Sequence, residues 1–209
     1  MSNKNITPKI NLDIRIMASP KRETMAKELC AELGLTQDHI IWDDRPNGGN
    51  PRYTAQKAWL YPFDENVTHR MVIQDDAIIC DDFLWAANNC LEFQPDITWT
   101  FFMPRTDNKD GYFRNTIPQI AGVCIAMPKQ HIIDCWQWCD EKMADCEHDD
   151  TCISRWLFET TTLPMTTVPS LCNERGESLL GHNAPHPQHY SKNAAHEKDW
   201  NNTTVSLLL

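Results

Sequence analysis

Short apolar runs alternate along this chain with longer segments in which apolar residues recur every three or four positions. The first pattern is typical of buried strands, and the second is typical of helices that pack on one face. LDIRIMAS (12–19) and RMVIQDD (70–76) are therefore predicted strands. KQHIIDCWQWCDEKM (129–143) is a predicted helix whose buried face includes Ile133 and Trp136. The alternation predicts an α/β fold with a partly parallel sheet covered by helices.

The start and the end of the first predicted helix are marked by residues that cap helices. Ser19 followed by Pro20 fits an N-cap and a first helical position, and Gly34 fits a C-terminal stop. Asp81 and Asp82 are placed to start a later helix, because acidic side chains are stabilised near helix N-termini. The other predicted elements are the strands HIIWDD (39–44), ITWTFFM (97–103) and AGVCIAMP (121–128) and the helices RYTAQKAWLYP (52–62) and EHDDTCISRWLF (147–158).

The length of the chain suits a single domain. Its 209 residues are enough to bury one sizeable core. We expect this domain to span residues 1–181, because residues 182–209 are rich in His, Asn and Pro. A segment of that composition is predicted to be an irregular tail or a lid over the site.

Charge and hydropathy narrow the classes of function. The formal net charge of −10 argues against a wide basic surface, and so against indiscriminate binding to a phosphate backbone. No apolar run approaches the roughly 18 residues of a membrane span, and the N-terminal residues do not resemble a secretory signal. We therefore expect a cytoplasmic protein without a membrane span, whose nine cysteines stay reduced.

Asp75 and Asp76 stand side by side where the strand MVIQ (71–74) is predicted to leave the core. In sheets of this type, ligands bind beyond the carboxyl ends of the strands. Two carboxylates supply hard oxygen ligands for Mg²⁺ or Mn²⁺, and such an ion neutralises a diphosphate leaving group. The alternative is a solvated turn whose acids face the N-terminus of the next helix. The spacing alone leaves both readings open.

The segment VIQDDAIICDDF (72–83) resembles the acidic segment of GT-A glycosyltransferases, especially compact phage and bacterial enzymes related to lipopolysaccharide and collagen-type glycosyltransferases. The resemblance covers most of residues 12–181 and implies a GT-A-like (Rossmann-like) fold with a mixed, mostly parallel sheet flanked by helices. It also implies metal-dependent transfer of a sugar from a nucleoside-diphosphate sugar to a hydroxyl. Further matching segments in the expected order are IRIMASPKRE (14–23), AQKAWLYP (55–62), AGVCIAMPKQHI (121–132), HDDTCISRWL (148–157) and VPSLCNERGESLLG (168–181).

Carried over by position, the resemblance makes Asp76 the main carboxylate on a Mn²⁺ or Mg²⁺ ion. Asp75 would touch ribose, sugar or a second coordination position. The loop after the first strand would lie against the nucleotide of the donor, with Arg22 able to face phosphate. The residues that the resemblance places at this loop are Ala18, Ser19, Pro20 and Arg22.

The chain departs from the family pattern at two positions that bear on the metal. Gln74 stands where an acid is frequent, which removes one carboxylate from the site. Glu174 stands where a His often completes the metal shell. A glutamate oxygen suits a hard cation, so Glu174 is one candidate ligand. His182, directly after Gly181, is the other.

Asp149 and Asp150 lie at the predicted start of the helix 147–158. An inverting transferase needs a carboxylate near the acceptor hydroxyl to take its proton, and we expect Asp150, rather than Asp149, to serve as this base. The alternative is that one of the two acids is the N-cap of the helix. Both uses are compatible.

Other classes of function fit parts of the sequence. A structural zinc site would find enough ligands in one segment, but the spacings are not those of common zinc modules, and two of the cysteines fit the buried face of their helix. A metal-dependent nuclease or phosphatase would usually gather more acids. A non-catalytic carbohydrate-binding protein is a further alternative. The zinc candidates are Cys135, Cys139, Cys146, His148 and Cys152.

The compact chain resembles phage transferases more than membrane-associated polysaccharide enzymes. Hydroxymethylated pyrimidine in phage DNA is therefore a candidate acceptor, and such an enzyme would work in the host cytoplasm. A lipopolysaccharide or protein acceptor is the alternative. A base must leave the stack to be modified, which calls for a few cations that contact phosphate. Cations in or beside predicted loops are Lys21, Arg22, Arg45, Arg52, Lys57, Arg105, Lys109 and Arg114.

Overall fold

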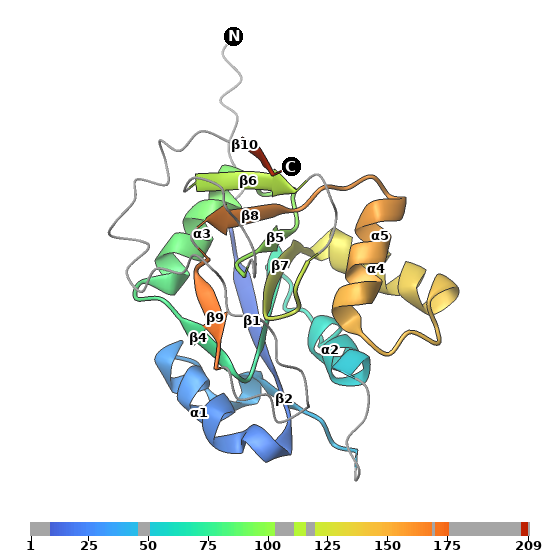
Figure 1. The fold of residues 1–209 in the computed structure, drawn as a ribbon. Helices are drawn as coiled ribbons and strands as arrows, with labels where there is room; N and C mark the ends of the chain where they lie inside the picture. The colour runs from blue at the N-terminus through green and yellow to red at the C-terminus, as the bar shows by residue number, and fades with distance from the viewer. Residues whose placement is uncertain are drawn as a thin grey trace.

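The computed structural model describes residues 9–45, 51–102, 120–168 and 170–175, and the backbone alone of 111–115 and 206–208. Helices and strands alternate over most of this length, as the sequence predicts (Figure 1). The helices are α1 (Glu23–Glu32), α2 (Pro51–Trp59), α3 (Phe83–Phe93), α4 (Lys129–Lys142) and α5 (Asp149–Glu159), with the 3-10 turns η1 (Pro20–Arg22) and η2 (Gln37–His39). The strands are β1 (Leu12–Ala18), β2 (Ile40–Trp42), β3 (His69–Gln74), β4 (Ala77–Ile79), β5 (Trp99–Thr100), β6 (Gly111–Asn115), β7 (Cys124–Pro128), β8 (Met165–Val168), β9 (Cys172–Glu174) and β10 (Ser206–Leu208).

The central sheet has eight strands in the order β10-β6-β8-β5-β7-β3-β1-β2. The pairings β1–β2, β1–β3, β5–β8 and β6–β10 are parallel. The pairings β3–β7, β5–β7 and β6–β8 are antiparallel. Strands β4 and β9 form a separate antiparallel pair. The predicted α/β class with a mixed, mostly parallel sheet is therefore confirmed.

Helices cover both faces of this sheet, and each face has its own hydrophobic core. Figure 1 shows α1 and α3 on one side and α2, α4 and α5 on the other. Successive residues of a strand point to opposite faces, so β3 sends Met71 and Ile73 into the first core and Val72 into the second. Burial on both faces explains why the central strands read as continuous apolar runs.

Two local details differ from the sequence predictions, and a third agrees with them in position. Ile133 was predicted to be buried, but it is 42% exposed on the outer side of α4. The N-cap residue of α5 is His148, and Asp149 and Asp150 belong to the first turn instead. Asp82 does precede α3, but its side chain makes no capping hydrogen bond.

Part of the predicted C-terminal tail belongs to the sheet. Residues 206–208 form β10, which pairs with β6 in parallel. The boundary predicted between residues 181 and 182 lies outside the described residues. Within the described part of the chain, no helix combines the length and the apolar character of a membrane span.

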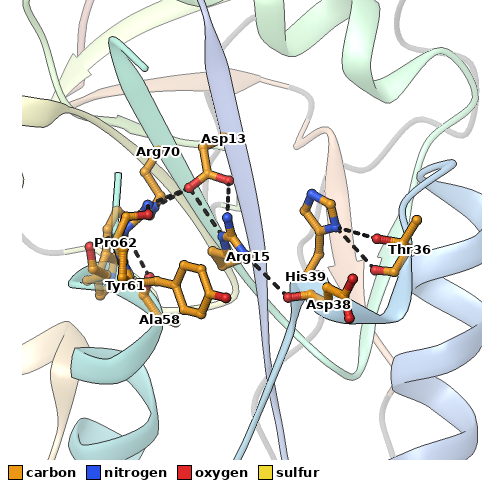
Figure 2. A network of polar contacts seen from close by, with 10 residues as sticks. Asp13, Arg15, Thr36, Asp38, His39, Ala58, Tyr61, Pro62 and Arg70 are labelled. Atoms are coloured by element: carbon orange, nitrogen blue, oxygen red, sulfur yellow. Dashed lines mark hydrogen bonds and ion pairs between the residues drawn. The ribbon is translucent and has the colours of Figure 1, made fainter. Parts of the chain in front are cut away.

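Arg70 is a fully buried cation that joins α2 to the sheet (Figure 2). Its Nε donates to Oδ2 of Asp13 at 2.6 Å, across the β1–β3 pairing. Its Nη1 donates to the carbonyl oxygens of Trp59 at 2.7 Å and Tyr61 at 2.6 Å. The guanidinium also lies 3.8 Å from the ring centre of Phe63. Arg70 therefore satisfies carbonyls that the C-terminus of α2 leaves without helical partners.

We predict that Arg70→Ala destabilises the protein by on the order of 3–5 kcal/mol, because it removes the charge that pairs with Asp13 and leaves buried carbonyls without donors. Urea denaturation of the variant and the wild type measures the difference. Arg155→Ala is the matched control, since the side chain of Arg155 is 54% exposed and contacts Glu159 and Phe158 of its own helix. The control should change stability by about 0.5 kcal/mol. Equal losses in the two variants would contradict a structural role for Arg70.

Candidate functional site

The parallel pairing of β1 and β3 brings the residues that follow each strand to the same edge of the sheet. The backbone N–H of Ser19, after β1, donates to Oδ2 of Asp75 at 2.8 Å. In return, the backbone N–H of Asp75 donates to the carbonyl oxygen of Met17 at 3.1 Å. The loop predicted to contact a nucleotide and the predicted acidic pair are therefore in direct contact.

Arg22 lies between the two acids. The 3-10 turn η1 follows Ser19 and turns the side chain of Arg22 toward the end of β3. Its Nη1 lies 2.9 Å from Oδ1 of Asp75 and 2.6 Å from Oδ2 of Asp76. All three residues are buried, with exposed fractions of 8% for Arg22, 3% for Asp75 and 8% for Asp76. The alternative of a solvated acidic turn therefore does not describe these residues.

Two polar atoms of this cluster are buried without a hydrogen-bond partner among the described residues. They are Nε of Arg22 and Oδ1 of Asp76. An unpaired buried donor or acceptor usually costs about 1–3 kcal/mol, so such atoms are uncommon in folded proteins. The Arg22 donor and the Asp76 acceptor can therefore each form one further hydrogen bond.

Burial disfavours the ionised form of Asp75. It raises the pKa of this carboxyl from 3.8 to about 6, and the neighbouring Asp76 acts in the same direction. The Ser19 N–H and the Arg22 guanidinium act in the opposite direction, because they stabilise the ionised form. The ionised pair therefore depends on the cation beside it.

The small β4–β9 sheet brings Glu174 next to Asp76. Ala77, directly after Asp76, is the partner of Glu174 in this antiparallel pairing. The backbone N–H of Arg175 donates to the carbonyl oxygen of Asp76 at 2.9 Å. The pairing therefore brings the backbone of Glu174 beside the residue that follows Asp76. His182 lies outside the described residues.

The start of α5 lies beside the end of β3, with Gly122 between them. A Cβ atom at Gly122 would be 3.1 Å from Nε2 of Gln74, 3.5 Å from Cβ of Asp150 and 3.7 Å from Oδ2 of Asp149. These side chains therefore approach a backbone position that is open because it carries no side chain. The structure brings Asp149 and Asp150 to the same edge as Asp75.

Asp149 and Asp150 have different surroundings. Asp149 is 4% exposed, and burial, with Asp150 next in effect, raises its pKa from 3.8 to about 7. Asp150 is half-buried, and its Oδ1 accepts a hydrogen bond from the backbone N–H of Thr151 at 2.6 Å. One acid is enclosed, and the other is accessible.

The remaining residues predicted for the nucleotide loop have mainly backbone roles. Ala18 ends β1 and accepts a hydrogen bond from the N–H of Asp43 at 2.8 Å. Pro20 is exposed and begins η1, where Ser19 Oγ accepts from the N–H of Lys21 at 3.3 Å. Sequence reasoning missed Gly122, whose only signal is a single glycine just before a strand.

Three of the candidate zinc ligands form a packed group of buried thiols. Cys135, Cys139 and Cys152 are fully buried, with 3.9 Å between the sulfur atoms of Cys135 and Cys139. Hydrogen bonding between thiols and burial raise the pKa values of Cys139 and Cys152, which disfavours the thiolate that zinc requires. Among the residues that the structure describes, no three His, Cys, Asp or Glu side chains are placed to hold a metal ion.

Asp76 nevertheless fits a hard cation. Its Oδ1 is a buried carboxylate oxygen with no partner in the described part of the chain. Mg²⁺ is commonly held by only one or two protein carboxylates, with substrate phosphates and water supplying the other ligands. The donor set at this site therefore suits an ion that binds together with a phosphorylated substrate.

Comparisons with known proteins give no family assignment. No protein-family model matches the chain, and no curated protein matches it. Among solved structures, the inositol-1-phosphate CTP transferase from T. maritima is similar, with a TM-score of 0.38 and 8% sequence identity. The match covers 73% of this chain and 64% of that chain, which is less than two thirds of its length.

We predict that Asp149→Asn removes a large part of the pH dependence of stability. Because folding raises the pKa of Asp149 from 3.8 to about 7, the folded state binds its proton more tightly than the unfolded state does. Stability is therefore full below the lower value and falls as the pH rises toward the upper one, by on the order of 4 kcal/mol for this group.

Urea denaturation at about pH 4 and about pH 8 tests this prediction. The Asp149→Asn variant should be more stable than the wild type at the higher pH and similar to it at the lower one. Asp134→Asn is the control, since Asp134 is exposed on α4. A wild-type protein that is equally stable at both pH values would contradict the raised pKa of Asp149.

Proposed function

We propose that this protein is a metal-dependent glycosyltransferase that moves a sugar from a nucleoside-diphosphate sugar to a hydroxyl acceptor. The observation that supports this most is the cluster of Arg22, Asp75 and Asp76 at the carboxyl edge of parallel strands, with Asp149 and Asp150 beside it. A donor diphosphate needs cations, and an acceptor hydroxyl needs a base. The two groups of residues supply these functions from neighbouring elements.

On the donor side, Ser19 and Pro20 form the loop that would contact the nucleotide. Asp75 is held by the N–H of Ser19, and in this proposal it contacts ribose, sugar or a second coordination position of the ion. Asp76 would hold Mn²⁺ or Mg²⁺, with Glu174 or His182 as a further protein ligand. When bound, the ion would neutralise the charge of the diphosphate leaving group. Arg22 would add a cationic contact to the same phosphates.

On the acceptor side, Asp150 is the proposed base. It is half-buried rather than enclosed, so an acceptor hydroxyl can reach its carboxylate. Asp149 is the enclosed neighbour, and its pKa of about 7 lets it share a proton with the site near neutral pH. The first turn of α5 stabilises negative charge on both residues.

Hydrolysis and binding of donors test the enzyme class. Purified protein with Mn²⁺ should slowly release nucleoside diphosphate from at least one nucleotide-sugar in a panel, and that donor should raise the melting temperature. A panel without turnover or thermal shift would remove the enzyme proposal. Release of pyrophosphate from nucleoside triphosphates, without sugar transfer, would replace it with a nucleotidyl transfer.

We predict that Asp76→Asn abolishes metal-dependent binding of the donor and leaves the fold intact. The substitution keeps the size of the side chain but removes the charge that a divalent ion needs, so donor affinity in Mn²⁺ should fall by about a hundredfold or more. Calorimetric titration with the donor measures this. Asp64→Asn, an exposed acid in the turn after α2, should bind the donor like the wild type. Unchanged affinity in Asp76→Asn would place the site elsewhere.

Hydroxymethylated pyrimidine in DNA remains a proposed acceptor. Several of the predicted cations contact carboxylates, namely Arg22 with Asp75, Arg45 with Asp43 and Lys57 with Asp44. Arg52 is buried, and its Nη2 lies 2.9 Å from Oδ1 of Asp140. With a formal net charge of −10, DNA binding should therefore be modest and strongly sensitive to salt.

We predict that DNA containing hydroxymethylated pyrimidine gains a sugar in the presence of Mn²⁺ or Mg²⁺ and that unmodified DNA does not. The hydroxymethyl group is the only difference between the two substrates and supplies the acceptor oxygen. Mass spectrometry of digested nucleosides detects the adduct. If no adduct forms with any donor, while a lipid-linked sugar or a protein hydroxyl is modified, the lipopolysaccharide or protein alternative holds.

A further inference from the structure

We infer that Arg22 exchanges partners when the donor binds. In the free protein its guanidinium holds the two carboxylates of the Asp75–Asp76 pair together. When a divalent cation takes this place, Arg22 moves to the diphosphate of the donor, so that binding of the cation and binding of the diphosphate become coupled. This inference rests on the proposed function and adds an order of events to it.

The contacts of Arg22 show that it occupies the place of a cation. A single nitrogen, Nη1, contacts both Oδ1 of Asp75 at 2.9 Å and Oδ2 of Asp76 at 2.6 Å. A divalent ion between the same carboxylates would be repelled by the guanidinium and would compete for the same oxygens. The cation and Arg22 in its present position therefore exclude each other.

In the present arrangement Arg22 and Asp76 each have one buried polar atom without a hydrogen bond to any described residue. Oδ1 of Asp76 is a buried acceptor and Nε of Arg22 is a buried donor, and neither has a partner in the described part of the chain. A cation would satisfy the carboxylate oxygen. A phosphate would satisfy the guanidinium, because Nε and a terminal nitrogen form a fork that matches two phosphate oxygens.

The charges of the cluster explain why binding of the cation and binding of the diphosphate favour each other. One guanidinium faces two carboxylates, so the cluster has one negative charge more than positive charge when both acids are ionised. A divalent cation neutralises the pair fully, but it leaves Arg22 as a buried cation without an anion. A diphosphate supplies that anion. Each ligand thus removes the cost that the other creates, which is positive coupling.

The backbone allows the exchange without refolding. Asp75 keeps the N–H of Ser19 on its other oxygen, and the carbonyl of Asp76 keeps the N–H of Arg175. The carboxylate of Asp75 and the backbone of Asp76 are therefore held by main-chain contacts that do not involve Arg22. Movement of Arg22 breaks only the side-chain contacts that the new ligands replace.

Arg22→Gln tests the exchange through two affinities measured by calorimetry. Binding of Mn²⁺ alone should become about tenfold tighter, because the competing cation is gone. Binding of UDP, GDP, ADP or CDP at saturating Mn²⁺ should become about tenfold weaker, because the phosphate contact is lost. Lys21→Gln is the matched control, since it removes the same charge from the exposed neighbour and should change both affinities far less.

The signs of the two effects separate the explanations. If Arg22 stays on the carboxylates, both affinities should become tighter in Arg22→Gln; if it serves only phosphate, binding of Mn²⁺ alone should not change. Either result would overturn the exchange. A wild-type protein that binds none of the four diphosphates would overturn the proposed function itself, whereas diphosphate binding with the wrong signs would overturn the exchange alone.

The exchange can also be followed directly in the wild-type protein. In protein with ¹⁵N-labelled arginine, the Nε–H signal of Arg22 should shift when Mg²⁺ is added and shift again when the diphosphate that binds is added. The signal is identified by its loss in Arg22→Lys. An Nε–H signal that does not respond to either ligand would contradict the exchange.

Discussion

The parallel pairing of β1 with β3 is the contact on which the rest of the molecule depends. The register runs from Leu12 opposite His69 to Met17 opposite Gln74. At one end of this pairing Asp13 lies opposite Arg70, and the pair joins the sheet to the end of α2. At the other end the chain leaves both strands together, which brings the loop after β1 against the acids after β3. A shift of register would separate both sets of contacts at once.

The two buried arginines at these ends show the difference between a structural cation and a functional one. Arg70 is enclosed by a carboxylate, several carbonyl oxygens and an aromatic ring. Arg22 contacts two carboxylates, but within the described part of the chain its Nε and Oδ1 of Asp76 have no hydrogen-bond partner. The first arrangement is complete and favours rigidity, whereas the second retains capacity for a ligand.

Residue pattern was enough to predict the strands with long apolar runs and the helix with a periodic apolar face. The runs around β1, β3 and β7 and the periodic face of α4 have many apolar positions, so local pattern and tertiary burial agree. The strand predicted over 97–103 is reduced in the structure to the two residues of β5, and the short β4 and β9 strands were not predicted from the sequence. Strands this short carry too few positions for a period of two, and they are defined by their partners across the sheet.

In the candidate site, too, local signals could be read from the sequence, whereas contacts between distant segments could not. The acids Asp75 and Asp76 could be found because a carboxylate pair after an apolar run is a local signal. The contact between these acids and Arg22 joins residues more than fifty positions apart and depends on one 3-10 turn. The role of Gly122 as open space beside Asp149 depends on the packing of α5 against the end of β3, which no single segment encodes.

The distribution of thiols makes the protein suitable for fluorescence work. Eight of the nine cysteines are buried, and only Cys146 is partly accessible. A thiol-reactive dye would therefore attach at a single native position, three residues before Asp149 and the first turn of α5. A dye at that position would report on events at the neighbouring edge of the sheet in real time, without any engineered cysteine.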